Sequence, residues 1–284
     1  MPADKDAKTG KADTVKETLQ GMWLAMSNLR FLALILITAG FWAIQGQLYF
    51  AMPEYVLRMA GETYKPEWYA NVNPLVVVLF VVAITQMVRN WKPQNSILVA
   101  MLMIPVSALT MALSAQFSQN IEIWGMSIHP ITFMMVIGIA IQGLAECFLS
   151  PKWLEFASLQ APPGKEGTFL GFAHMNTFFA WIFGSVLSGF LLARYCPEPG
   201  TLDEATRAAH TAALAGQGPM PAEYAHAHYL WFAYALVGLT SLVPWLTADG
   251  NYAPAFVIGA SLAIIAMLSI WILIPTVERL KPKQ

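Results

Sequence analysis

Charge is scarce in this sequence. Only 12% of its 284 residues are charged, and 57% are hydrophobic. Soluble domains average about 25% charged and about 45–50% apolar residues, so the composition argues against an ordinary soluble enzyme. The 16 Lys and Arg residues are balanced by 17 Asp and Glu residues. Because there is no basic excess to neutralise phosphates, the composition also argues against a nucleic-acid-binding protein.

Cysteine is rarer still. Cys147 and Cys196 are too few for a disulfide framework and lack metal-ligand spacing, so both are expected to be packing residues. His226 and His228 lie two residues apart, which suits one helix face poorly, so no metal site is predicted. The sequence also lacks a phosphate-binding glycine loop, a nucleophile elbow, a zinc-binding helix and a haem-attachment motif. An enzyme is therefore the least supported class.

Long apolar runs take the place of the missing charge. A helix that crosses about 30 Å of hydrocarbon needs about 20 apolar residues. The sequence therefore predicts an all-α, polytopic membrane helix bundle, with seven candidate spans at about 31–56, 74–89, 95–115, 130–150, 168–194, 228–247 and 254–275. Gly238 and Pro244 in the sixth run are also compatible with a re-entrant helix, and the chain would then cross the membrane six times. Both last runs are long enough to cross, which favours seven.

Polar segments flank and interrupt these spans. Residues 1–30 are lysine-rich, show no cleavable signal peptide, and are predicted to form a cytoplasmic linker with a short amphipathic helix. Residues 195–226 are predicted to be a solvated outer loop, with a short helix from Thr201 to Leu214 that Thr201 caps. Residues 276–284 form a polar tail. Lys and Arg are concentrated in the N-terminal segment and in the loops on its side, which places the N-terminus in the cytoplasm and the chain in the cytoplasmic (inner) membrane.

Ionisable residues inside the predicted spans are very few. Glu146 is the only acid well inside one, and a charge at the bilayer centre is costly unless it is paired or faces water. Gln142, Glu146 and Leu149 are spaced three to four residues apart, so a polar stripe points in one direction. This pattern favours a carboxylate that holds a substrate ammonium or carries a proton over one that only hydrogen-bonds a neighbouring helix.

Other polar residues complete the candidate set. Gln45, Gln47 and Asn73 either line a substrate-binding cavity or hydrogen-bond between helices. His174 is the only histidine well inside a span. It is a candidate proton relay with Glu146, or a hydrogen-bonding residue near the interface.

Four short motifs resemble one transporter family in their order and spacing. They are Phe41-Trp42-Ala43 with Gln47, Trp68-Tyr69 with Asn73-Pro74-Leu75, Glu146 with Ser150-Pro151, and Gly167-Thr168 with Gly171. Together they resemble the seventh, eighth, tenth and eleventh helices of the proton-coupled oligopeptide transporters, a branch of the major facilitator superfamily. The resemblance covers about residues 29–189 and, more loosely, a terminal helix. It implies the C-terminal six-helix half of such a transporter, with one additional hydrophobic helix.

The resemblance implies roles for particular residues. Glu146 is expected to hold the amino group of a peptide or another small amine-bearing solute, Asn73 to hydrogen-bond the substrate, and Ser150 to lie beside the same cavity. Gly46 stands where the family has an acid tied to proton coupling, and Ala173 stands where it has a pocket tryptophan. Proton-coupled symport therefore stays open, the substrate need not be a peptide, and no cofactor other than a coupled proton is expected.

The resemblance does not say which protein completes the fold. A facilitator cavity lies between two halves at the bilayer midplane, and the resemblance covers only one of them. One hypothesis is a half-transporter that acts with a separate N-terminal half or with a second copy of itself. The alternative is a transport-inactive half that serves as a structural subunit of a larger membrane complex. The expected contacts are the lipid bilayer and a small-molecule or peptide substrate, and no nucleic acid.

Overall fold

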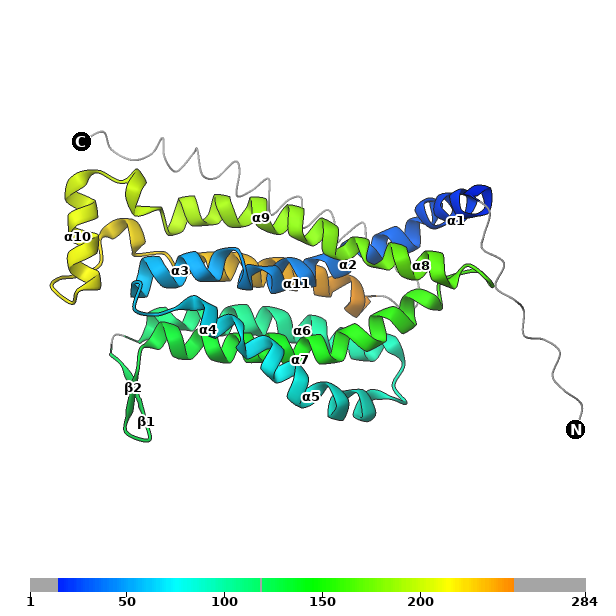
Figure 1. Cartoon of the computed structure of the whole chain (residues 1–284), viewed down its shortest axis with the longest axis horizontal. Coiled ribbons are helices and arrows are strands. Elements are labelled where there is room, and N and C mark those ends of the chain that lie inside the picture. The colour runs from blue at the N-terminus through cyan, green and yellow to red at the C-terminus, as the bar shows by residue number, and fades with distance from the viewer. Residues whose placement is uncertain (1–14, 118, 248–284) are drawn as a thin grey trace, which may run out of the picture.

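Helices make up most of residues 15–117 and 119–247, the part of the chain that the computed structural model describes. The long helices lie side by side along one axis as an elongated bundle (Figure 1). One end of the bundle carries α10 and a β-hairpin, and the other carries α1; they are called the α10 end and the α1 end below. The seventh predicted span, 254–275, the tail 276–284 and the first part of the N-terminal linker lie outside the described residues.

The elements follow one another with short connections. The helices are α1 (Val15–Ser27), α2 (Leu29–Gln45), α3 (Ala51–Ala60), α4 (Pro66–Ala70), α5 (Val72–Val88), α6 (Pro93–Ala112), α7 (Pro130–Ser158), α8 (Glu166–Ala173), α9 (Met175–Tyr195), α10 (Glu204–Leu214) and α11 (Tyr229–Thr247). Four 3-10 turns are η1 (Gly46–Leu48), η2 (Leu113–Gln116), η3 (Pro199–Thr201) and η4 (Ala222–Tyr224). The strands are β1 (Ile121–Ile123) and β2 (Met126–Ile128), which pair antiparallel.

The membrane-protein prediction is confirmed by the helices themselves. Five described segments are long and apolar enough to cross a membrane, namely Phe31–Ala60, Pro66–Val88, Pro93–Gln116, Pro130–Ser158 and Glu166–Tyr195. The predicted run 228–247 is also helical, as α11, which packs against α6 and α2. The fourth span is longer than predicted, because α7 continues through Pro151 to Ser158.

The all-α prediction needs one small correction, because β1 and β2 form a hairpin at the α10 end. Its two-residue turn is Trp124-Gly125, and both residues have positive φ, at 49° and 79°. Such a turn matches the twist of two short antiparallel strands. The hairpin projects sideways from the bundle (Figure 1), so it does not alter the helical core.

Two predicted spans are interrupted. The first is divided into α2 and α3 by the turn η1, and the fifth into α8 and α9 at His174. In η1 the buried Gln47 donates from Nε2 to the carbonyl oxygens of Ala43, at 2.7 Å, and of Gly184 in α9, at 3.3 Å. A Cβ atom on Gly184 would lie 3.2 Å from this Nε2, so glycine permits the close approach. The side chain of Gln47 thus ties the break in the first span to α9.

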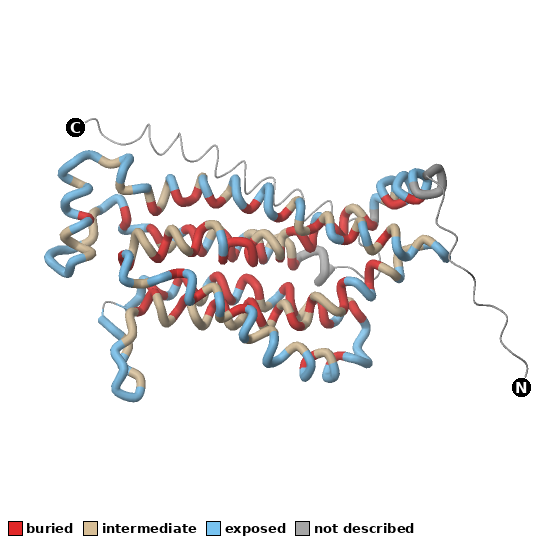
Figure 2. Tube along the Cα trace, viewed as in Figure 1, coloured by how far each residue is buried: buried red, intermediate tan, exposed pale blue. Residues whose placement is uncertain are grey.

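Burial distinguishes the centre of the bundle from its edge. The Phe31–Ala60 segment is 72% buried over its most apolar window, whereas the Pro66–Val88 segment is only 17% buried. Figure 2 shows the same contrast, with red along α2, α3 and α6 and pale blue over much of α5 and α9. The apolar outer faces of α5 and α9 are therefore available to lipid or to another membrane helix.

The helix in the polar segment 195–226 starts later than predicted. Thr201 belongs to η3, and α10 begins at Glu204. The N-cap is Asp203, whose Oδ1 accepts a hydrogen bond from the Thr206 backbone N–H at 3.0 Å. Hydrogen bonds from the side chain and backbone of Thr206 hold the pKa of Asp203 below its usual value. The predicted cap at Thr201 is therefore wrong, because the acid two residues later satisfies the free amides of the first turn.

This segment is mostly exposed, as a solvated loop would be, but three buried residues, Cys196, His210 and Tyr224, also dock it on the bundle. His210 of α10 donates from Nε2 to the carbonyl oxygen of Arg58 at 2.7 Å, and its ring stacks on Tyr224 at 4.6 Å between centroids. Tyr224 donates to the carbonyl oxygen of Pro197 at 2.8 Å, and Arg58 donates to that of Cys196 at 2.6 Å. Burial raises the pKa of the Cys196 thiol to about 12. We call residues 195–226 the cap.

His210→Ala is expected to loosen the cap. The substitution removes a buried ring and leaves the Arg58 carbonyl without its donor, which should lower the free energy of unfolding by about 1–3 kcal/mol. His226→Ala is the control, because His226 is exposed in the same segment. The measurement is thermal unfolding in detergent, together with the rate of tryptic cleavage at Arg207 in α10. Identical melting and cleavage of the two variants would contradict the docking role of His210.

Candidate functional site

The Glu146 carboxylate lies where α2, α5 and α7 meet. Glu146 projects from the middle of α7 and is half-buried. Gln45, the last residue of α2, donates from Nε2 to Glu146 Oε2 at 2.7 Å. Asn73, in the first turn of α5, lies close enough to interact with the same carboxylate, although its Nδ2 makes no hydrogen bond of regular geometry. The fold thus brings together three polar residues that are far apart in the sequence.

Several buried polar atoms near this carboxylate make no hydrogen bond of regular geometry in the described part of the chain. They are Gln45 Oε1, Asn73 Nδ2 and Gln142 Oε1. Gln142 lies one turn before Glu146 on α7, so it shares the predicted polar face. Buried polar groups in proteins are nearly always hydrogen-bonded. A site that presents a carboxylate and unpaired amide atoms is therefore suited to a polar ligand or to bound water.

No basic side chain among the described residues forms an ion pair with Glu146. Arg58–Glu54 and Lys152–Glu155, both at 2.8 Å, are ion pairs between described side chains, and neither involves Glu146. Each lies near the end of a helical span. Glu146 is therefore an acid within a span interior that is stabilised by amide groups and lacks a counter-charge from these parts of the chain.

Gly143 allows the close approach that assembles this site. A Cβ atom at Gly143 would lie 3.0 Å from Val76 Cβ and 3.1 Å from the carbonyl oxygen of Asn73. Both contacts belong to α5, and one is to backbone, which cannot move aside without moving the helix. Glycine at this position therefore sets how near Asn73 comes to Glu146. The sequence places Gly143 in a span, but its role depends on the position of a second helix.

The other predicted site residues lie apart from this carboxylate. Gln47 is buried, but its Nε2 is bound to the α2 and α9 backbone. Ser150 is half-buried one turn beyond Glu146 and makes no side-chain hydrogen bond among the described residues. His174 is exposed at the break between α8 and α9, and no described hydrogen bond joins it to Glu146. The structure therefore does not bring the proposed Glu146–His174 relay together.

Asn176 is a buried polar residue that the sequence analysis did not single out. Asn176, in the first turn of α9, is fully buried, and its Nδ2 has no partner in the described regions. Its Oδ1 accepts a hydrogen bond from the Thr177 backbone N–H at 2.6 Å. Its only signal in the sequence is a single amide within an apolar run, two residues after His174.

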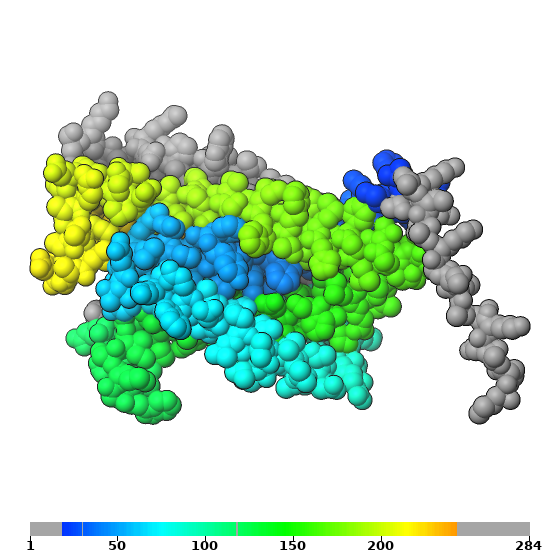
Figure 3. All heavy atoms as spheres, viewed as in Figure 1, coloured from blue at the N-terminus to red at the C-terminus, as the bar shows by residue number. Residues whose placement is uncertain are grey.

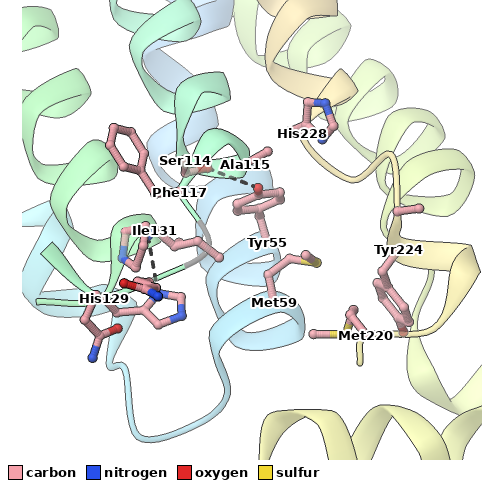
Figure 4. Close-up of a pocket in the computed structure, with 14 residues that line it drawn as sticks. Tyr55, Met59, Ser114, Ala115, Phe117, His129, Ile131, Met220, Tyr224 and His228 are labelled. Atoms are coloured by element: carbon pink, nitrogen blue, oxygen red, sulfur yellow. Dashed lines mark hydrogen bonds between the residues drawn. The ribbon is translucent and has the colours of Figure 1, made fainter. Parts of the chain in front are cut away.

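A separate, half-open cavity of about 310 Å³ lies at the α10 end (Figure 4). Among the residues that line it are Tyr55, Met59, Ser114, His129, Tyr224 and His228. The Nδ1 atom of His129 accepts a hydrogen bond from the Ile131 backbone N–H at 3.3 Å and so caps α7. Burial lowers the pKa of His129 and of His228, and no charged side chain of the described residues lines the cavity. Glu146 lies more than four turns further along α7, roughly 24 Å at 1.5 Å per residue, so the two sites are distinct.

Comparison of the chain with protein-family profiles, with curated proteins and with solved structures finds no match. The function is therefore proposed from the sequence motifs and from the geometry around Glu146.

Proposed function

We propose that this chain is the six-helix half of a secondary transporter of the major facilitator type. In this proposal Glu146 binds the ammonium group of a peptide or another small amine-bearing solute. The observation that carries the proposal is the Glu146 carboxylate inside a span, held by amides and without a basic partner among the described residues. An intramembrane acid without a counter-charge is by default a candidate functional site, because burying its charge is costly.

The chemistry of the site fits an ammonium group. A primary ammonium brings one positive charge and three N–H donors. The site offers the carboxylate of Glu146 and two unpaired amide oxygens, those of Gln45 and Gln142. A charge-assisted hydrogen bond to the carboxylate is stronger than one between neutral groups, and the two amide oxygens would accept the remaining donors.

The arrangement of the spans supports the proposed half-transporter. The described residues contain six long apolar segments when α11 is counted with the five candidate spans. The connections from α5 to α6 and from α7 to α8 lie at the α1 end (Figure 1), and Arg89, Lys92, Lys152 and Lys165 lie in or next to these connections in the sequence. Basic loops are retained on the cytoplasmic side, so the proposal places the α1 end in the cytoplasm and the cap outside.

Uptake by the native assembly tests the proposal. The chain, purified through an affinity tag from its native membrane with its associated proteins, is reconstituted into liposomes and supplied with radiolabelled dialanine. Saturable uptake that unlabelled dialanine inhibits, and that N-acetyl-dialanine does not, is the expected result because acetylation removes the ammonium charge. The absence of saturable uptake of dialanine would overturn the proposal.

A buried glycine favours a second candidate function. Gly46 is buried in η1, and a Cβ atom there would lie 3.4 Å from the Phe50 ring. This distance is an ordinary van der Waals contact, so space alone does not exclude a side chain here, but Gly46 supplies no carboxylate of the kind that proton coupling uses in the resembling family. A transport-inactive structural subunit is consistent with this feature. Stoichiometric purification within a larger membrane complex, together with no uptake, would favour that function.

A further inference from the structure

Helix α1 leaves an apolar stripe uncovered. Leu19, Met22, Trp23 and Met26 are all exposed, and Trp23 is 74% exposed. Their spacing of three, four and seven residues places them on one helix face. Gln20 and Ser27 lie on a neighbouring side, together with Leu24, which is 43% exposed. The helix therefore presents an apolar stripe beside a surface of mixed polarity, and the described residues leave both exposed.

A third face of α1 holds the helix against α8. Ala25 is fully buried, and a Cβ atom on Gly21 would lie 3.2 Å from the hydroxyl oxygen of Thr168 in α8. Figures 1 and 3 show α1 at the end of the molecule, close to α8. The contact fixes which side of α1 faces outward, so the exposed stripe has a defined direction.

The stripe lies beside the predicted entry into the membrane. Asn28 separates α1 from α2. It is the N-cap of α2, because its Oδ1 accepts a hydrogen bond from the Phe31 backbone N–H at 3.0 Å. The first candidate span begins at Phe31, and the Glu166–Tyr195 span begins two residues before Thr168. Helix α1 and its apolar stripe thus lie next to the starts of two candidate spans.

We propose that α1 is an interfacial helix whose stripe inserts into the lipid leaflet at the α1 end. Tryptophan is enriched at this depth, because its ring is apolar and its N–H is polar. The preceding segment and the first turn of α1 together contain Lys5, Lys8, Lys11 and Lys16, but also Asp4, Asp6, Asp13 and Glu17. Their charges nearly cancel, so insertion of the apolar face binds α1 to the surface and attraction to anionic headgroups contributes little. This inference is independent of what the chain transports.

Site-specific fluorescence in a bilayer tests the proposal. Full-length Trp23→Cys, Met22→Cys and Gln20→Cys variants are labelled with an environment-sensitive fluorophore and placed in nanodiscs of phosphatidylcholine and phosphatidylglycerol. The native cysteines are buried, so the unsubstituted protein serves as the labelling blank. Lipids that carry a nitroxide near the headgroup should quench the labels at positions 22 and 23 at least threefold more than the label at position 20.

Two results would overturn the proposal. The first is equal quenching at positions 20, 22 and 23, which would mean that the stripe does not enter the lipid. The second is protection of Trp23→Cys from labelling in the purified assembly in detergent, which would mean that a protein covers the stripe. Replacing phosphatidylglycerol by phosphatidylcholine should leave the quenching ratio unchanged, and loss of the ratio would show that charge attraction binds the helix instead.

Discussion

Glu146→Gln is expected to weaken binding of dialanine to the purified assembly by about 10- to 100-fold. The substitution keeps the size of the side chain but replaces a charge-assisted hydrogen bond with a neutral one. Hydrogen bonds to charged groups contribute about 1.5–3 kcal/mol, and each 1.4 kcal/mol is about tenfold in affinity. Gln45 remains able to donate its hydrogen bond to the new amide oxygen. The measurement is equilibrium binding of radiolabelled dialanine by scintillation proximity.

Glu155→Gln is the matched control for this variant. Glu155 lies on the same helix, carries the same charge and is exposed, where it pairs with Lys152 at 2.8 Å. The control therefore removes one negative charge from α7 without touching the cluster at Glu146. Its affinity for dialanine should equal that of the unsubstituted protein. Equal affinities of the two variants would contradict the role assigned to Glu146.

Gly143→Val is expected both to destabilise the bundle and to weaken binding. Its Cβ atom would meet Val76 Cβ at 3.0 Å and the Asn73 carbonyl oxygen at 3.1 Å, and the branched side chain adds further atoms. Overpacking of this kind costs about 1–3 kcal/mol. The strain is relieved by moving α5 away from α7, which takes Asn73 away from Glu146. Lower thermal stability and lower affinity for dialanine should therefore appear together.

Gly171→Val provides the control for Gly143→Val. Gly171 is helical in α8, and a Cβ atom there has no described neighbour within 4 Å. Both variants change the intrinsic helix propensity in the same way. They differ in packing, because only the side chain at position 143 meets a neighbouring helix. If the two variants bind dialanine equally, the separation of α5 and α7 does not position the site.

The positions of the spans were predictable, and the breaks within them were not. Apolar runs of about 20 residues mark membrane helices because the bilayer core offers no partner for exposed backbone groups. The turn η1 and the break at His174 lie inside such runs, where composition does not change. At η1, a contact from Gln47 to Gly184 in α9 accompanies the break. That contact depends on tertiary packing, which the local pattern does not contain.

In the candidate site, too, some features were predictable from the sequence and others depend on tertiary packing. Glu146 was found from the sequence because acids are so rare inside the spans. Gln45 and Gln47 looked equivalent, but two residues of helix rotate a side chain by roughly 200°, so one amide reaches Glu146 and the other reaches α9. In the cap, Thr201 and Asp203 are both favourable N-cap residues. In the structure Asp203 is the N-cap, and the sequence pattern alone does not choose between the two.

Protection of Glu146 from chemical labelling tests the central claim most directly. A hydrophobic carbodiimide modifies carboxyl groups that lie within membrane spans, and mass spectrometry of peptides from α7 measures the modification at Glu146 and at Glu155 in the same sample. Saturating dialanine should suppress labelling of Glu146 while leaving Glu155 unchanged, and N-acetyl-dialanine should suppress neither. Labelling of Glu146 at the same rate with and without dialanine would contradict the claim that this carboxylate binds the solute ammonium.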